Sequence, residues 1–249
     1  MAKHQAVGVD IGGTGIKAAL VNLEHGAIIG DRVRVATPQG AKPADVLQAV
    51  REVLDTLEVT DQRMSLGVAF PAIVKHGRTM SASNVSDDWI GFEAEKFFED
   101  GLGRDIAFTN DADAAGIAEA RYGAARGNDG LVILTTLGTG IGSAFLYDGA
   151  LIPNTELGHL RHDGDSIERW AAYSAKEREQ LSWDAWARRL QELYSHIERL
   201  FSPDLIVVGG GVSKHSHEFL PLLELRTPIV PAVHRNAAGI IGAASLSHG

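Results

Sequence analysis

A glycine-threonine-glycine segment occurs twice in this chain, in nearly the same setting and half a chain length apart. Residues 7–22 read VGVDIGGTGIKAALVN, and residues 132–147 read VILTTLGTGIGSAFLY. The second copy starts 125 positions after the first (132 minus 7), which is half of the 249 residues. Each copy is an apolar run, a glycine-rich turn and a second β-prone run, so each predicts a β-hairpin. The repeat indicates a chain built from two duplicated halves.

The two turns have the composition of anion-binding loops. Glycines let backbone N–H groups converge on an anion without side-chain clashes, and the threonine adds a hydroxyl. Two such turns on duplicated halves can hold one polyphosphate, which favours phosphoryl transfer. Gly142 stands where the first copy has Lys17, so the turns are not equivalent. The predicted donor-binding residues are Gly12, Gly13, Thr14, Gly15 and Lys17 in the first copy, and Gly138, Thr139 and Gly140 in the second.

Composition limits the class of protein. The chain has 45% hydrophobic and 22% charged residues, as ordinary globular proteins do. It has no cysteine, which excludes disulfides and thiolate metal sites, and no apolar stretch long enough to cross a membrane. A net charge of −9 argues against nucleic acid as a partner. We expect a cytoplasmic protein without a membrane or nucleic-acid partner.

Hydrophobic periodicity and breaker residues predict the order of elements. In the first half we expect strands at 6–10, 16–22, 27–36 and 65–71, and helices at 43–57 and 93–101. The second half is expected to start with a strand at 105–110 and a helix at 111–122, followed by a hairpin at 131–148, a long helical stretch at 166–201, a strand at 204–209 and a helix at 237–246.

This order predicts an α/β fold with two duplicated βββαβα domains of the ribonuclease H-like, actin/hexokinase type, flanking a cleft. We expect residues 1–109 with 236–249 to form a small domain that carries the first phosphate turn. Residues 110–235 would form the large domain.

Seven segments together identify a family resemblance. The chain resembles the ROK family (repressor, open reading frame, kinase) of sugar kinases over essentially its whole length, and within it the bacterial polyphosphate glucokinases. The resemblance implies transfer of a phosphoryl group from inorganic polyphosphate, with ATP as a further donor, to the 6-hydroxyl of glucose, with mannose as a further candidate acceptor. It also implies Mg²⁺ and a homodimer. The segments are DIGGTGIK (10–17), FPAIV (70–74), SNVSDDWIG (83–91), TNDADAAGIAEARYG (109–123), TTLGTGIGSA (135–144), IPNTELGHL (152–160) and VVGGGVS (207–213).

Asn110 and Asp111 stand where a strand ends and a helix begins, an edge at which α/β sheets present functional groups. Phosphorylation of a hydroxyl needs a carboxylate that orients it and accepts its proton. The alternative is that either residue is the helix N-cap. The resemblance implies that Asp111 is the catalytic base. It also implies sugar contacts by Asn84, Asn110, Asp111, Glu156 and His159.

Two further expectations concern the donor, and two concern the fold. Asp10 ends the first strand beside the glycine turn, where its carboxylate can hold Mg²⁺ directly or through water. Gly210 and Gly211 resemble the family's nucleotide-side loop. Asp113 is expected to cap its helix, and Trp89 to lie in the core.

The chain departs from the family pattern at two places. Many relatives hold zinc with a cysteine-rich segment, but residues 161–169 read RHDGDSIER, so we expect no zinc site. Pro71-Ala72 stands where relatives often carry Pro-Gly, which predicts a reshaped sugar pocket.

Four alternative functions can be compared with these residues. Gly13-x-Gly15-x-x-Ala18 fits a dinucleotide-binding pattern formally, but a strand follows where that fold needs a helix. A transcriptional repressor of this family would carry a helix-turn-helix domain ahead of the phosphate turn, which begins by residue 10 here. A catalytically silent sugar-binding protein and an ATP-only sugar kinase stay open, and only the resemblance favours polyphosphate over ATP.

Overall fold

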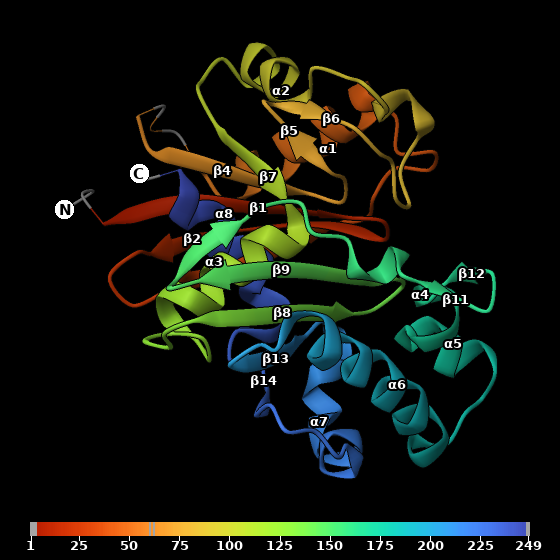
Figure 1. Cartoon of the computed structure of the whole chain (residues 1–249). Helices are drawn as coiled ribbons and strands as arrows, with labels where there is room; N and C mark the ends of the chain where they lie inside the picture. The colour runs from red at the N-terminus through yellow and green to blue at the C-terminus, as the bar shows by residue number, and fades with distance from the viewer. Residues whose placement is uncertain (1–3, 60, 62, 248–249) are drawn as a thin grey trace. The chain divides into compact units, whose positions relative to one another are not determined.

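The computed structural model describes residues 4–59, 61 and 63–247. These residues divide into two compact units (Figure 1). The first unit takes the chain up to Ala118 and again from Ala237 on, and the second runs from Glu119 to Asn236. The sequence-predicted division into a small domain (1–109 with 236–249) and a large domain (110–235) stays a prediction.

The first unit contains a five-stranded sheet in the order β3-β2-β1-β4-β7. Strands β1, β2 and β3 are antiparallel neighbours, and β4 and β7 continue the sheet in parallel with β1. The expected strand at 105–110 therefore belongs to this first sheet, although the sequence order suggested that it opens the second half. The strands are β1 (Gln5–Gly12), β2 (Gly15–Asn22), β3 (Ala27–Val35), β4 (Ser65–Phe70) and β7 (Ala107–Asn110).

The second unit repeats this topology in the order β10-β9-β8-β13-β14. Again three antiparallel strands are followed by two parallel ones. The predicted duplication is confirmed at the level of strand order and direction. The strands are β8 (Leu131–Leu137), β9 (Ile141–Tyr147), β10 (Ala150–Ile152), β13 (Leu205–Gly209) and β14 (Ile229–Pro231).

The two glycine turns differ in length. In the first hairpin Gly12 pairs with Gly15, so two residues form the turn. In the second hairpin Leu137 pairs with Ile141, so Gly138, Thr139 and Gly140 form a three-residue turn. The repeat in the sequence therefore gives two hairpins of different register.

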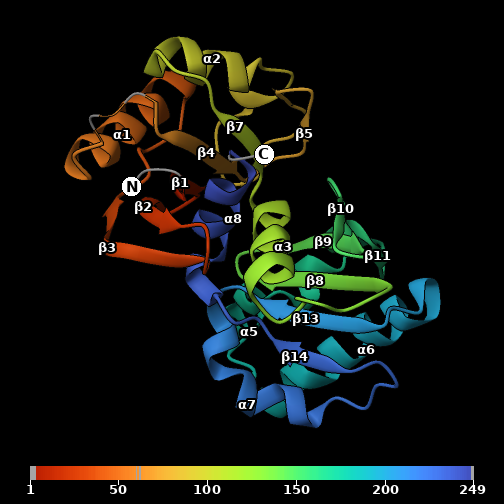
Figure 2. The same ribbon diagram turned by 90° about the vertical axis from the view of Figure 1, so that its left-hand side faces the viewer.

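Helices cover both faces of the first sheet. α1 (Pro43–Thr56) and α2 (Ala94–Leu102) pack on the face to which Val7, Val9 and Ile11 point. α3 (Asp111–Tyr122) and α8 (Ala238–Leu246) lie side by side on the other face (Figure 2). Three glycines allow this close approach, because an added Cβ would lie under 2.0 Å from a backbone oxygen at Gly8, Gly67 and Gly242.

In the second unit one long helix supplies much of the core. α6 (Trp183–Phe201) lays Trp186, Leu190 and Tyr194 against strands β8 and β13. The expected long helical stretch over 166–201 is divided into three helices. The chain is extended at Ala172, and Ser182 caps α6 by accepting the Ala185 N–H. The other two helices are α4 (Glu168–Ala171) and α5 (Tyr173–Arg178).

The remaining elements are short. Trp89 is fully buried and its indole N–H donates to the Ala41 carbonyl at 2.8 Å, so its expected core role is confirmed. Among the helices of the described residues, none combines the length and the apolarity that a membrane crossing requires. The short elements are β5 (Val74–Lys75), β6 (Arg78–Thr79), β11 (Arg161–His162), β12 (Asp165–Ser166) and α7 (Ser216–Phe219).

Candidate active site

Asp111 is the first residue of α3, directly after the last residue of β7. One oxygen of its carboxylate accepts the N–H of Ala112 at 2.8 Å. Asn110, the preceding residue, is 6% exposed, whereas the Asp111 side chain is only partly buried. The strand end therefore holds Asn110 inside the unit and presents Asp111 at its surface.

Asn110 is the residue that caps α3. Its Oδ1 accepts the N–H groups of Ala112 (2.8 Å) and Asp113 (3.1 Å), while its Nδ2 donates to the Ala72 carbonyl (3.0 Å). Such a cap contributes about 1 kcal/mol. Both lone pairs of Oδ1 are engaged, so only the second Nδ2 proton of Asn110 can serve a sugar hydroxyl. The alternative that Asn110 is the helix N-cap is thus confirmed, and the expected capping role of Asp113 stays a prediction.

Ala72, which stands where relatives often carry glycine, contacts the residue that makes this cap. Its side chain is 3% exposed and packs in the hydrophobic core of the first unit. Its carbonyl is the acceptor for Asn110. A change at this position would therefore reach the site through the orientation of Asn110.

Asp10 and Lys17 form an ion pair across the first hairpin. Lys17 Nζ lies 3.1 Å from Asp10 Oδ2, with Asp10 opposite Lys17 in the strand register. Gly239 of α8 lies on the other side of Asp10, since a Cβ there would come within 3.0–3.4 Å of the carboxyl group. The Asp10 carboxylate is therefore held between a cation and the start of a helix, where the backbone dipole favours negative charge.

Arg34 and Asn84 also lie at the first turn. Arg34 donates from Nη2 to the Thr14 carbonyl at 3.0 Å, and its guanidinium lies over Gly15. Asn84, in a left-handed conformation (φ 61°), lies against Gly13, where an added Cβ would be 2.7 Å from that of Asn84. The first unit thus places a predicted sugar contact beside the predicted phosphate turn.

The second turn is held by two side chains that follow it in sequence. The backbone N–H of Ser174 donates to the Gly138 carbonyl (3.0 Å), and the Ser174 hydroxyl donates to the Thr139 carbonyl (2.6 Å). Glu168 Oε2 accepts the Ile141 N–H at 3.1 Å. These contacts fix both sides of the three-residue turn.

Glu168 also reaches the segment that carries Glu156 and His159. A Cβ at Gly158 would lie 3.1 Å from Glu168 Oε2 and 2.4 Å from the Ile141 carbonyl. Burial raises the pKa of the Glu156 carboxyl, His159 lowers it in part, and the Glu168 carboxylate raises it further. The second unit therefore brings Glu156, His159 and the second phosphate turn together.

Ser143 fixes the chain just before this segment. Its hydroxyl donates to the Thr155 carbonyl (2.8 Å) and accepts the N–H of Leu157 (3.0 Å). Glu156 lies between these two anchors and stays partly buried, whereas His159 is exposed. The backbone of the predicted sugar-binding segment is thus tied to β9 on both sides of Glu156.

Gly210 and Gly211 follow β13 in the second unit. Gly210 has φ 80° and lies against the backbone of Leu137, where an added Cβ would come within 2.4–2.9 Å. Gly211 faces Asn236, whose Oδ1 would be 3.6 Å from an added Cβ. Gly210 therefore adjoins the second phosphate turn, because Leu137 directly precedes Gly138.

Sequence reasoning missed Arg34, Glu168 and Ser174. Arg34 was detectable in principle, because it pairs with Lys17 in the β2–β3 register. Glu168 and Ser174 follow the turn by about thirty residues, and only the folded second unit shows their contacts with it.

Mg²⁺ fits the donor set at the first turn. No group of three His, Asp or Glu side chains able to hold a metal occurs among the described residues. Mg²⁺ in phosphate-transferring sites takes one or two carboxylates, and substrate phosphates and waters complete its six ligands. Asp10, a single partly buried carboxylate beside a phosphate-type turn, suits that arrangement.

Comparison with known proteins agrees with this geometry. The chain is 46% identical over 246 residues to a polyphosphate glucokinase of Mycobacterium tuberculosis, covering 98% of this chain and 92% of that protein. It superposes with a TM-score of 0.93 on an inorganic polyphosphate/ATP-glucomannokinase from an Arthrobacter species, with 52% identity and 96% of each chain covered.

A more distant structure shows the same fold. A ROK family glucokinase from Streptomyces griseus, solved with glucose and AMPPNP, superposes with a TM-score of 0.84 at 24% identity, covering 98% of this chain and 99% of that one. At that identity the likeness concerns the fold alone.

Residues 6–170 of this chain match the ROK family. Together with the relatives above 40% identity along nearly the whole chain, this match establishes that the chain belongs to the ROK family.

Proposed function

We propose that this chain is a glucokinase that transfers the terminal phosphoryl group of inorganic polyphosphate, and also of ATP, to the 6-hydroxyl of glucose. The observation that carries the proposal is the position of Asp111, a partly exposed carboxylate at the end of β7 in the unit that also holds the Asp10–Lys17 hairpin. The relatives at 46% and 52% identity, whose names specify polyphosphate, support the choice of donor.

Asp111 acts as the general base. Its carboxylate orients the 6-hydroxyl of glucose and accepts its proton as the oxygen attacks the terminal phosphorus. The bond between that phosphorus and the bridging oxygen breaks, and the shortened polyphosphate leaves with the bond electrons. The α3 cap made by Asn110 keeps Asp111 at one place on the helix, so Asn110 acts as a positioning residue as well as a sugar contact.

The glycine turns and their cations hold the donor. Backbone N–H groups at residues 12–15 and 139–140 would bind phosphate oxygens, the Gly138 N–H closes the second turn onto the Gly140 carbonyl, and Gly210 and Gly211 would bind more distal phosphates. Lys17 and Arg34 place two positive charges at the first turn. Mg²⁺, held by Asp10 directly or through water, would supply further neutralisation of charge on the transferred group.

Asn84, Asn110, Glu156 and His159 bind sugar hydroxyls in this proposal. Amide and carboxylate groups suit the task because each can take more than one hydroxyl bond in a fixed geometry. The raised pKa of Glu156 means that hydrogen bonds and nearby cations do not fully offset the burial of its ionised carboxylate. Hydroxyl donors from a bound sugar would supply the missing hydrogen bonds.

Four finer proposals concern the acceptor, the assembly, the location and the domains; the first two rest on the family resemblance, the third on composition and the fourth on the order of elements. Mannose would serve as a second acceptor, the working unit would be a homodimer, and the protein would act in the cytoplasm. The functional division would place residues 1–109 with 236–249 in a small domain and 110–235 in a large one, so that Asp111 belongs to the large domain.

The test is formation of glucose 6-phosphate by the purified chain with Mg²⁺ and long-chain polyphosphate as sole donor, followed by ³¹P NMR. The proposal predicts product and progressive shortening of the polymer. Parallel reactions with ATP and with mannose measure the finer specificity. Activity with ATP alone would contradict the donor assignment, and no product with either donor would favour a silent sugar-binding protein.

A further inference from the structure

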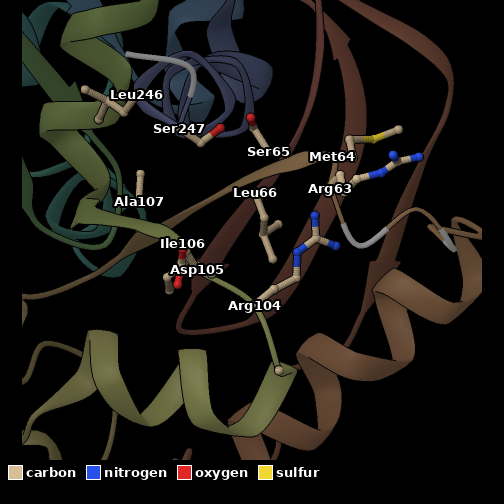
Figure 3. A pocket seen from close by; sticks show the side chains of 11 residues that line it. Arg63, Met64, Ser65, Leu66, Arg104, Asp105, Ile106, Ala107, Leu246 and Ser247 are labelled. Atoms are coloured by element: carbon tan, nitrogen blue, oxygen red, sulfur yellow. The ribbon is translucent and has the colours of Figure 1, made fainter. Parts of the chain in front are cut away.

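A hollow lies at the edge of the first unit where β4 and β7 begin. It has a volume of about 660 Å³ and is open to solvent. Since β4 ends at Phe70 and β7 at Asn110, the hollow and Asp111 lie at opposite ends of the same strands. Its side chains are drawn in Figure 3. The lining residues used below are Arg63, Ser65, Arg104, Asp105 and Ser247.

Arg104 enters the hollow because α2 ends two residues earlier, at Leu102. Gly103 adopts a left-handed conformation (φ 67°) and donates its N–H to the Glu99 carbonyl. The chain then turns, and Figure 3 shows the Arg104 side chain running beside Leu66 towards the segment that carries Arg63. The helix end thus directs a guanidinium group into the hollow.

Two guanidinium nitrogens of Arg104 are buried there without an acceptor among the described residues. Within the described part of the chain, neither Nε nor Nη2 has a hydrogen-bond partner. Burial lowers the pKa of the Arg104 guanidinium, and the nearby Asp61 carboxylate opposes that shift in part. A buried, charged donor without a partner is unfavourable, so a movement of the Arg104 side chain that lets these nitrogens meet an acceptor from solution would be favourable.

The neighbouring acidic groups do not fill this role. Asp61 accepts the backbone N–H of Arg63 at 3.0 Å and its Nε at 3.4 Å, which lowers the pKa of Asp61. Asp105 lines the hollow, but it makes no hydrogen bond with the two buried Arg104 groups. The Arg63 side chain is 93% exposed, and its contact with Asp61 uses Nε, which leaves its terminal nitrogens at the surface for a ligand.

We propose that this hollow binds a phosphate group, as inorganic phosphate or on a small phosphoester, through the guanidinium groups of Arg104 and Arg63. Arginine forks match phosphate oxygens with paired, charge-assisted hydrogen bonds. The hydroxyls of Ser65 and Ser247 are further polar groups on the wall. The volume lies within the range of small-molecule sites and exceeds what a bare anion needs, which leaves room for an ester.

This site is separate from the donor site. β7 spans four residues from the hollow to Asn110, about 13 Å at strand geometry. Phosphate binding at the glycine turns would affect wild type and hollow variants alike. The inference therefore does not rest on the proposed kinase activity and can fail or succeed independently of it.

The test measures thermal unfolding of the full chain against inorganic phosphate and, separately, glycerol 3-phosphate. Arg104→Met removes the buried charge, Arg63→Gln removes the exposed one without threatening the fold, and Arg199→Met is the matched control on the exposed side of α6. Without phosphate, Arg104→Met is expected to unfold at the same temperature as wild type or higher. With phosphate, wild type should unfold at a higher temperature than Arg104→Met. The phosphate concentration that gives half of the maximal rise in Tm should increase at least about tenfold in Arg104→Met and less in Arg63→Gln.

A crystal soaked with tungstate locates the anion. Density within hydrogen-bond distance of Arg104 in wild type, absent in Arg104→Met, would support the proposal. A larger shift with glycerol 3-phosphate than with phosphate would assign the site to an ester, and equal shifts to the free anion. If phosphate stabilises wild type and Arg104→Met equally, any tungstate there is an adventitious ion only and the proposal is overturned. Destabilisation by Arg104→Met in phosphate-free buffer would also overturn it, because Arg104 would then have a structural partner.

Discussion

Lys17 Nζ lies 3.1 Å from the Asp10 carboxylate, across the hairpin whose turn is predicted to hold the donor. The pair is partly buried, with side-chain exposures of 26% and 17%. A pair of this kind contributes at most about 1 kcal/mol to stability. Its position at the mouth of a phosphate-type turn therefore points to a role in binding rather than in folding.

Replacing Lys17 with Gln should weaken donor binding and leave the fold intact. Loss of one charge-assisted contact to phosphate predicts a rise in the KM for polyphosphate of about tenfold. The KM for glucose should not change. Lys75→Gln, an exposed lysine of β5 in the same unit, is the control. Equal effects of the two substitutions would show that Lys17 acts only through overall charge.

Gly138→Ala separates the structural from the functional role of the second turn. An added Cβ at Gly138 meets no described atom within 4 Å, so stability should change by less than about 0.5 kcal/mol. If the turn binds phosphates, the methyl group should raise the donor KM about tenfold while the KM for glucose stays constant. Urea unfolding and steady-state kinetics measure the two effects. Unchanged donor kinetics would argue that residues 138–140 form an ordinary turn.

Glu156→Gln should stabilise the protein while it weakens glucose binding. A carboxyl with a raised folded-state pKa favours the folded state below its ordinary value of 4.5, and this contribution is lost as pH rises through the raised value. Glutamine cannot ionise, so the variant should have a higher Tm than wild type at pH 7. The difference should shrink as pH falls towards 4.5.

Thermal unfolding across this pH range, with glucose titrations at pH 7, checks both parts. A lower Tm for the Glu156→Gln variant at pH 7 would mean that the ionised carboxylate is structurally required. Unchanged glucose affinity would remove Glu156 from the sugar contacts.

Gly239→Ala tests the placement of Asp10. The added methyl would lie 3.0 Å from Asp10 Cγ and 3.1 Å from Oδ1, so the carboxylate must shift by a few tenths of an ångström. A shift at this position predicts a loss in kcat of about tenfold. Stability should hold or rise, since alanine favours a helix by about 1 kcal/mol over glycine. In contrast, Gly242→Ala on the same helix would place a Cβ 1.7 Å from the Ala114 carbonyl and should destabilise the unit.

The sequence predicted most of the regular elements because local patterns specify them. The apolar alternation of Val7, Val9 and Ile11 and the proline at the start of α1 are local signals, and both elements lie where expected. The duplication was readable as well, since the two hairpins share residues at a fixed spacing. β10 and β14 were missed, because three-residue edge strands carry almost no periodic signal.

The site was only partly predictable, because several of its contacts join residues far apart in the sequence. The cap made by Asn110 was one of two open alternatives, and only the folded chain shows that its Oδ1 accepts the N–H groups of Ala112 and Asp113. Glu168 lies at the start of a helix that sequence periodicity merged with its neighbours. Its contact with the N–H of Ile141 depends on how the second unit folds.

Asp111→Asn tests the central claim most directly. Polyphosphate-dependent formation of glucose 6-phosphate should be compared in wild type, Asp111→Asn and the control Asp45→Asn, which changes an exposed aspartate in the first turn of α1. Asparagine keeps the size of the side chain but cannot accept the hydroxyl proton. The account predicts a kcat lower by about 10²–10⁴-fold in Asp111→Asn, with glucose affinity within about threefold of wild type and normal turnover in Asp45→Asn. Wild-type turnover by Asp111→Asn would contradict the assignment of Asp111 as the base.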